Sequence, residues 1–424
     1  MKSINILAAS ACVLATVGMA SATPTTVVLT GSTAYRSSVV KAIIHALGGT
    51  VNSDGSSPTL PSGSGFAYAG SSFTGANAHT FSGNLNGDSS KPVLIECSWT
   101  GSAAGVQTVA SSTSDYTVRV LPSSVDLTSR TGTSGYNDPT SSSATTSDYQ
   151  TVVPQIAMSD ASQASTPFNG TLPDSNGVSH TYSTLTDNPI GIVPFVWVKS
   201  KGASASITNI TPQNARAMWT GDGTLPLSMF SGNSSDSSTL VYATGRNADS
   251  GTRLTAFAES GIGTSSIVAQ YDCAKDAGSA NTFTDGIGLY DPETVNGLFF
   301  DYGQSGELSG GNLAKTSKMG KSGLGNSYVS YMSTGDAAVL VGNGGAILSY
   351  NGVTLDPSPT YTNLVEGKYT FWGYEHLLYK STLTGVTLST ATAIKSQLIG
   401  GDATLSTTAM HVQRQVDGGN VTHL

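Results

Sequence analysis

Charged side chains are scarce in this chain. Only 11% of the 424 residues are charged, and 27 acidic residues outnumber 19 basic ones, which gives a formal net charge of −8. The negative field repels the phosphate backbone of nucleic acids, so we expect no nucleic-acid partner. The same field gives no general attraction for anions, and an anion site here must depend on local dipoles and a well-placed arginine.

Cysteines and reactive sequence patterns are also few. The chain has 3 cysteines and 6 histidines, without a Cys-x-x-Cys pair or a Cys/His metal spacing, so we expect no metal and no cofactor. Whether Cys97 and Cys273 form a disulfide or stay as buried thiols is left open. Gly-x-Ser-x-Gly and His-Glu-x-x-His patterns do not occur, which makes an enzyme the least favoured class.

Long apolar runs are missing after the first residues. Met1 and Lys2 precede an apolar stretch at 4–17, which the small residues at 20–22 follow. This pattern predicts a signal peptide over 1–22, cleaved after Ala22, and therefore a periplasmic or secreted protein. No later stretch reaches the roughly 18 apolar residues of a membrane helix, so we expect no stable membrane insertion.

Apolar periodicity predicts alternating strands and helices between polar stretches. A strand is expected at 25–32, a helix at 35–47, a fully apolar buried strand at 190–198, and a helix that starts at Thr211 and Pro212. Such alternation indicates an α/β sheet. Two stretches near 52–90 and 111–148 are crowded with Gly, Ser, Thr and Asn, which predicts insertions that form surface loops or small β-appendages.

The segment Gly245 to Arg253 has the composition of an oxyanion site. Arg246 offers a planar fork of donors, and Ser250-Gly251-Thr252 opens an expected helix, whose N-terminal N–H groups favour an anion. The alternative is an ordinary capped helix with a surface arginine. Three other turns, at 30–35, 100–105 and 158–160, also lie where strands lead into helices or loops, which is where open α/β sheets bind ligands.

On these motifs the chain resembles the substrate-binding proteins of phosphate ABC transporters. That resemblance implies the two-lobed type II periplasmic binding protein fold, an α/β fold with a ligand cleft between the lobes. Lobe I is then expected at 23–185 plus 370–424, including both insertions, and lobe II at 186–369. The phosphate ligands that the resemblance implies are Thr33, Ala34, Ser102, Asp160, Arg246, Ser250, Gly251 and Thr252.

The chain departs from the family pattern at several positions. The family usually has an acidic residue one or two positions after the arginine, where this chain has Asn247 and Ala248, and its acid is Asp249. This difference predicts another orientation of the arginine. In the second loop, Ala103 and Ala104 replace residues that are often Ser or Gly.

The resemblance implies reversible binding of inorganic phosphate, for delivery to an ABC permease, by a monomer that makes and breaks no bond. An ionised Asp160 only accepts hydrogen bonds, so it favours a protonated anion over sulfate; its structural alternative is an N-cap of the next helix. The alternative function is a secreted surface or adhesion-type protein whose anion site is weak or vestigial. A phosphatase-like enzyme is the third reading.

Overall fold

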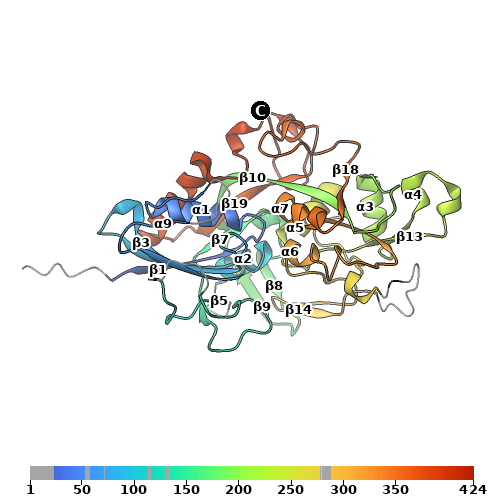
Figure 1. The fold of residues 1–424 in the computed structure, drawn as a ribbon. Helices are drawn as coiled ribbons and strands as arrows, with labels where there is room; N and C mark the ends of the chain where they lie inside the picture. The colour runs from blue at the N-terminus through green and yellow to red at the C-terminus, as the bar shows by residue number, and fades with distance from the viewer. Residues whose placement is uncertain are drawn as a thin grey trace, which may run out of the picture.

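One large mixed sheet organises the molecule (Figure 1). The computed structural model describes residues 23–52, 58–70, 72–112, 116–128, 134–276, 278 and 288–424. Eleven strands form this sheet in the order β12-β13-β16-β10-β19-β7-β1-β4-β3-β2, with β17 beside β10. Helices connect the parallel strands, and the predicted α/β class is confirmed.

The strands of the sheet come from distant parts of the chain. They are β1 (Thr25–Gly31), β2 (Gly65–Ala69), β3 (Ala78–Asn84), β4 (Pro92–Ser98), β7 (Ile156–Ser159), β10 (Leu185–Lys199), β12 (Thr224–Pro226), β13 (Leu240–Ala243), β16 (Ser327–Ser333), β17 (Ala346–Ile347) and β19 (Trp372–Lys380). Strand β1 pairs in parallel with β4 and β7, so the carboxyl ends of these three strands share one edge.

Strand β10 joins the two parts of the sheet. Its residues 185–194 pair with β19, and its residues 195–199 pair with β16. The chain then builds β12 to β17 and returns to the first part in β19. This path runs close to the boundaries expected for the two lobes, which stay a prediction.

Helices cover both faces of the sheet. The longer ones are α1 (Arg36–Ala46), α2 (Ser102–Ala110), α3 (Pro212–Trp219), α5 (Gly251–Ser260), α7 (Thr334–Gly342) and α9 (Gly385–Gln397), and the short ones are α4 (Ser228–Ser231), α6 (Gly310–Leu313) and α8 (Thr362–Val365). On β7, Met158 packs into the cluster that contains the apolar side of α1, whereas Ala157 packs into the cluster of α2. Neighbouring strand residues face opposite ways, so α1 and α2 lie on opposite faces.

Several predicted elements are confirmed with small shifts of their ends. The expected strand at 25–32 is β1, the helix at 35–47 is α1, and the apolar run at 190–198 lies inside β10. Thr211 is the N-cap of α3, where its side chain accepts a hydrogen bond from the Asn214 N–H. Local signals were sufficient for these elements because caps and apolar faces are encoded by adjacent residues.

The first insertion is built into the core more deeply than the expected surface loops. Its residues form β2 and β3, which extend the sheet beside β4. Phe66, Phe73 and Phe81 are buried against one another in the main core. The polar composition of 52–90 hid these aromatic side chains, which supply enough apolar surface to hold the segment down.

The remaining strands form small two-stranded ladders around the sheet. They pair β5 (Val118–Val120) with β6 (Gln150–Val152), β8 (Gly170–Pro173) with β9 (Ser179–Tyr182), β11 (Asn209–Ile210) with β18 (Ser349–Tyr350), β14 (Glu293–Val295) with β15 (Leu298–Phe300), and β20 (Val412–Gln413) with β21 (Thr422–His423). The second insertion contributes β5, and the partner β6 follows directly after it.

The state of the cysteines was left open by the sequence. Cys97 and Cys273 are free and buried in separate clusters, so of the two alternatives the structure has the thiols. The predicted signal peptide at 1–22 lies outside the described residues. Among the residues that are described, no helix has the length and apolar character needed to cross a bilayer.

Replacing Phe81 tests whether the first insertion is part of the core. Phe81→Ala removes a side chain that is 0% exposed, and we expect a loss of about 3–5 kcal/mol in the free energy of unfolding. The control Asn84→Ala, at an exposed position of the same strand, should change it by less than about 0.5 kcal/mol. Urea denaturation of both variants measures the difference, and equal small effects would show that the insertion is only loosely attached.

Candidate functional site

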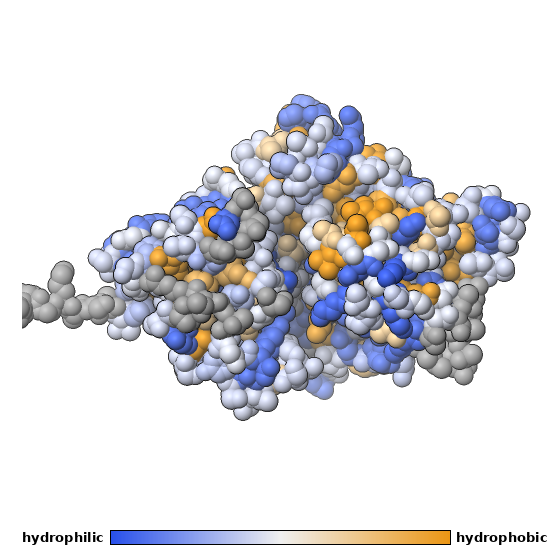
Figure 2. Space-filling model, in the orientation of Figure 1, coloured by the Kyte–Doolittle hydropathy of each residue, from blue (hydrophilic) through white to orange (hydrophobic). Residues whose placement is uncertain are grey.

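The four turns that the sequence singles out meet near the carboxyl ends of β1 and β7. The Gly101 N–H donates to the Gly31 carbonyl at 2.9 Å, and the Ala103 N–H donates to the Asp249 carbonyl at 3.0 Å. These bonds bring the turn before α1 and the N-termini of α2 and α5 together. Figure 2 shows the molecular surface hollowed between the part around β1 to β4 and the part around α5 to α7.

Asp160 lies at the centre of this junction. It follows β7, is 1% exposed, and accepts hydrogen bonds from the Ser102 hydroxyl on Oδ1 and from the Thr252 hydroxyl on Oδ2, the latter at 3.0 Å. Burial raises the pKa of Asp160, while both hydroxyls and Arg246 oppose that shift. The N-cap alternative is wrong, because the next helical turn has Ser162 as its N-cap.

Gly251 is required where the two α-helical N-termini approach Asp160. A Cβ atom at this position would lie 1.8 Å from Asp160 Oδ1 and 2.7 Å from Ser102 Cβ. Any side chain would therefore separate α5 from α2 and from the carboxyl group. The glycine of the Ser-Gly-Thr turn thus allows the start of α5 to approach Asp160 and Ser102 closely.

The Arg246 side chain is buried and carries its charge without a paired carboxylate. It is 2% exposed; its Nε donates to the Glu307 carbonyl at 3.0 Å and its Nη2 to the Leu308 carbonyl at 2.9 Å. No ion pair to it is found within the described residues. Burial lowers the pKa of Arg246, and the more distant Asp336 and Asp160 oppose this shift. The surface-arginine alternative is wrong.

Gln270 and Arg253, which are not among the predicted ligand residues, hold the Arg246 backbone in place. Gln270 Nε2 and Arg253 Nη1 both donate to the Arg246 carbonyl, at 3.1 and 3.0 Å. The Gln270 amide oxygen in turn accepts from Trp219 and Tyr331. Arg253 ends the segment that the sequence singles out, whereas no local sequence signal marks Gln270, Trp219 or Tyr331 as part of the site.

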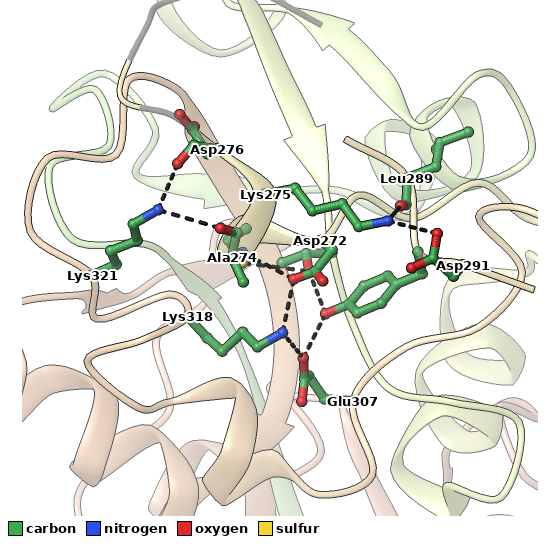
Figure 3. Close-up of polar contacts among 12 residues, drawn as sticks. Asp272, Ala274, Lys275, Asp276, Leu289, Asp291, Glu307, Lys318 and Lys321 are labelled. Atoms are coloured by element: carbon green, nitrogen blue, oxygen red, sulfur yellow. Dashed lines mark hydrogen bonds and ion pairs between the residues drawn. The ribbon is translucent and has the colours of Figure 1, made fainter. Parts of the chain in front are cut away.

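An ion-pair network fixes the loop whose carbonyls hold Arg246. Lys318 Nζ lies 2.9 Å from Asp272 Oδ1 and 2.6 Å from Glu307 Oε1, and Figure 3 shows it reaching between the two carboxylates. Burial alone would lower the pKa of Lys318, but its bonds to Asp272 and Glu307 raise it. Since the Glu307 main chain accepts from Arg246, Lys318 positions the guanidinium through Glu307.

The Asp249 carboxylate pairs with an amide side chain and not with the guanidinium of Arg246. Its carboxylate accepts from the Asn296 amide, and the Asn296 carbonyl accepts from Gln107 Nε2 at 2.8 Å. Burial raises the pKa of Asp249 to about 7, with Glu293 adding to the shift and Asn296 and Arg246 opposing it. The guanidinium is held instead by the main-chain carbonyls of Glu307 and Leu308.

The remaining predicted residues surround the same junction with donors. Thr33 and Ala34 lie between β1 and α1, and no hydrogen bond of the Thr33 hydroxyl is found in the described part of the chain. Ser250 is the N-cap of α5, where its oxygen accepts from the Arg253 N–H at 3.2 Å, so its own proton stays available. The first-turn N–H groups of α2 and α5 have no acceptor within their helices.

A separate pocket lies between β19 and α9. It has a volume of about 360 Å³ and is lined by Leu377, Tyr379, Ala391, Thr392, Lys395, Ser396, Ile399 and Gly400. None of the eight predicted ligand residues contributes to it, so the junction around Asp160 and this pocket are different places.

Comparisons with known proteins find structural similarity without close sequence relatives. No family model and no curated protein matches this chain. Solved structures do match, and those described next are named as phosphate-binding or phosphate-transport proteins, as the resemblance of the motifs predicts. A putative phosphate ABC transporter substrate-binding protein with bound phosphate from Clostridium perfringens is 13% identical, with 90% of this chain and 99% of that chain covered and a TM-score of 0.43.

Two further solved structures give similar values. An ABC-type phosphate transport receptor from Vibrio cholerae is 13% identical over 89% of this chain and 97% of that chain, with a TM-score of 0.42. A possible phosphate binding protein from Planctomyces limnophilus is 11% identical over 89% and 92%, with a TM-score of 0.38. What those proteins bind is a property of those proteins, and the site of this chain is argued from its own residues.

The raised pKa of Asp249 predicts a pH-dependent stability. Its usual value of 3.8 rises to about 7 in the folded protein, so the folded state holds the proton more tightly than the unfolded state. Wild type therefore loses free energy of unfolding as pH rises from the usual pKa to the raised one, and the lost stability is not regained at higher pH. Asp249→Asn cannot ionise, and its Tm should exceed that of wild type increasingly from pH 4 to 8. A Tm difference that stays constant over this range would contradict the assignment.

Proposed function

We propose that this protein is an extracytoplasmic solute-binding protein that reversibly binds inorganic phosphate at the junction around Asp160 and Arg246. The observation that carries the proposal is the buried Arg246 guanidinium, whose charge has no ion-pair partner among the described residues and which lies close enough to Asp160 to affect its pKa. The proposed ligand contacts are Thr33, Ala34, Ser102, Asp160, Arg246, Ser250, Gly251 and Thr252.

Electrostatics favour an anion at this place. A buried charge without a partner is costly, and a bound oxyanion offsets that cost with charge-assisted hydrogen bonds. Arg246 uses Nε and Nη2 for main-chain carbonyls, which leaves Nη1 for the ligand. The N-termini of α2 and α5 add the positive ends of their dipoles and first-turn N–H groups that have no acceptor within their own helices.

Asp160 supplies the selection between oxyanions. Hydrogen phosphate carries a P–OH group that donates to the carboxylate, whereas fully ionised sulfate would face it with lone pairs only. In the structure the Ser102 and Thr252 hydroxyls donate to Asp160. When the P–OH group of phosphate donates to one of the Asp160 oxygens, it replaces the Ser102 or the Thr252 hydroxyl there. The displaced hydroxyl then donates to the anion.

Binding involves residues of both predicted lobes. Ala103 and Asp160 belong to the first (23–185 plus 370–424), and Asp249 and Thr252 to the second (186–369). The bonds between Ala103 and Asp249 and between Thr252 and Asp160 therefore link the lobes, and they must break when the site opens. We propose hinge opening for release of phosphate to an ABC permease by a monomer, with no covalent step.

Replacing Arg246 tests the assignment of the site. Arg246→Gln should weaken phosphate binding by at least about 30-fold in calorimetry, because a buried charged hydrogen-bonding partner is lost. The matched control is Arg119→Gln, at an exposed position of β5, which removes the same charge and should bind as wild type does. Phosphate binding of undiminished strength in Arg246→Gln would show that the anion binds elsewhere.

Replacing Asp160 tests the selection of a protonated anion. Asp160→Asn keeps the shape of the side chain but adds an N–H donor, so the preference for phosphate over sulfate should fall at least about tenfold. Competition calorimetry with both anions measures the ratio of their Kd values. An unchanged ratio would remove Asp160 from this role.

A thermal shift separates transport from adhesion. A ligand that binds only the folded state raises its Tm, so millimolar phosphate should stabilise wild type. If neither phosphate nor sulfate changed the Tm, the surface or adhesion-type alternative with a vestigial site would be favoured instead.

A further inference from the structure

Two hairpins, one from each predicted lobe, meet tip to tip. Strands β8 and β9 lie in the range of the first lobe, and strands β14 and β15 lie in the range of the second. The Ser175 N–H at the tip of the first hairpin donates to the Gly297 carbonyl at the tip of the second, at 2.6 Å. Figure 1 shows β8, β9 and β14 together at the lower edge of the molecule, below α2 and α5, whereas the arrow of β10 lies at the top. The tips therefore connect the lobes away from this part of the strand that joins them.

Both tips have turns that their own residues define. A two-residue turn joins β14 to β15, and its residues Asn296 and Gly297 have φ values of 54° and 78°, the left-handed conformation that an Asn-Gly turn favours. At the other tip, the Asp174 carboxylate accepts two N–H groups of its own turn, both at 2.8 Å. Each tip is thus shaped without help from the other, which lowers the entropy that docking costs.

The tip of the second hairpin also contacts helix α2. The Asn296 carbonyl accepts from Gln107 Nε2 of α2 at 2.8 Å, and the same nitrogen donates to the Tyr182 hydroxyl of β9 at 3.2 Å. The Asn296 amide donates to the carboxylate of Asp249, whose carbonyl accepts from the Ala103 N–H in the first turn of α2. One turn therefore connects α2 with the segment that leads into α5.

Apolar packing strengthens this connection. Leu298 of β15 packs against the apolar cluster around α2, as Leu172 of β8 does. The next residue, Phe299, lies on the opposite side of its strand and is 59% exposed. Separating the hairpins exposes Leu298 to water, which is unfavourable.

We propose that the two hairpin tips form a latch that holds the cleft closed over the anion site. The contacts of Asn296, Gly297 and Leu298 join the two predicted lobes, so they must break before phosphate enters or leaves. The strength of the latch then sets the rate of phosphate exchange. This inference rests on the proposed function and adds the element that controls exchange, which includes none of the eight proposed ligand residues.

A disulfide across the latch tests this inference in the full chain. A Cβ atom at Gly297 would lie 3.2 Å from the Asp174 Cβ, just below the Cβ–Cβ spacing of disulfides, about 3.5–4.5 Å. In Asp174→Cys/Gly297→Cys, oxidised with phosphate bound, release of radiolabelled phosphate should be at least about 100-fold slower than in the reduced form. The reduced form is the matched control, because it has both substitutions and lacks only the crosslink.

A second pair of variants weakens the latch without a crosslink. Leu298→Ala should release phosphate about 5- to 30-fold faster than wild type, because less apolar surface is exposed when the cleft opens. Phe299→Ala, at the exposed neighbouring position of the same strand, should release it at the wild-type rate. Equal release rates in the two variants would contradict the latch.

Hydrogen exchange of the Ala103 N–H gives a readout that needs no phosphate. This group donates to the Asp249 carbonyl of the other predicted lobe, so its exchange requires the lobes to part. Oxidation of the double-cysteine variant should slow this exchange at least about tenfold. A phosphate release rate or an Ala103 exchange rate that oxidation leaves unchanged overturns the latch. If wild type binds no phosphate but oxidation still slows Ala103 exchange, the proposed function is overturned and the latch is supported.

Discussion

The buried charge of Arg246 is the constraint on which the rest of the site depends. A guanidinium cannot give up its proton under ordinary conditions, so its burial must be offset by hydrogen bonds and by an opposite charge. The protein supplies the hydrogen bonds through the carbonyls of Glu307 and Leu308. In the part of the chain that the structure describes, no carboxylate forms an ion pair with the guanidinium, and in the proposed function the anion supplies the opposite charge.

Polar contacts from several elements surround the Arg246 side chain. Lys318 fixes Glu307, Gln270 fixes the Arg246 backbone, and Asp160 is held by hydroxyls from two helices. Each contact restricts the movement of a group near Arg246. A site held in this way is preorganised, because the protein meets the cost of ordering its donors during folding and not during binding.

The structural features that depend on adjacent residues could be predicted from the sequence. The strand at 25–32, the cap at Thr211 and the turn at Ser250 follow from local patterns, and the structure brings the four predicted turns together. Partners such as Gln270 and Lys318 could not be predicted, because they reach the surroundings of Arg246 from other elements and carry no motif. The burial of the first insertion in the core could not be predicted, because its abundant Gly and Ser conceal the buried Phe66 and Phe81.

A crystal structure of the protein grown with phosphate tests the central claim most directly. The account predicts one tetrahedral anion within hydrogen-bond distance of the Arg246 guanidinium, with one of its oxygens against the Asp160 carboxylate. An anion bound elsewhere, with Arg246 still contacting only the carbonyls at 307 and 308, would contradict the account.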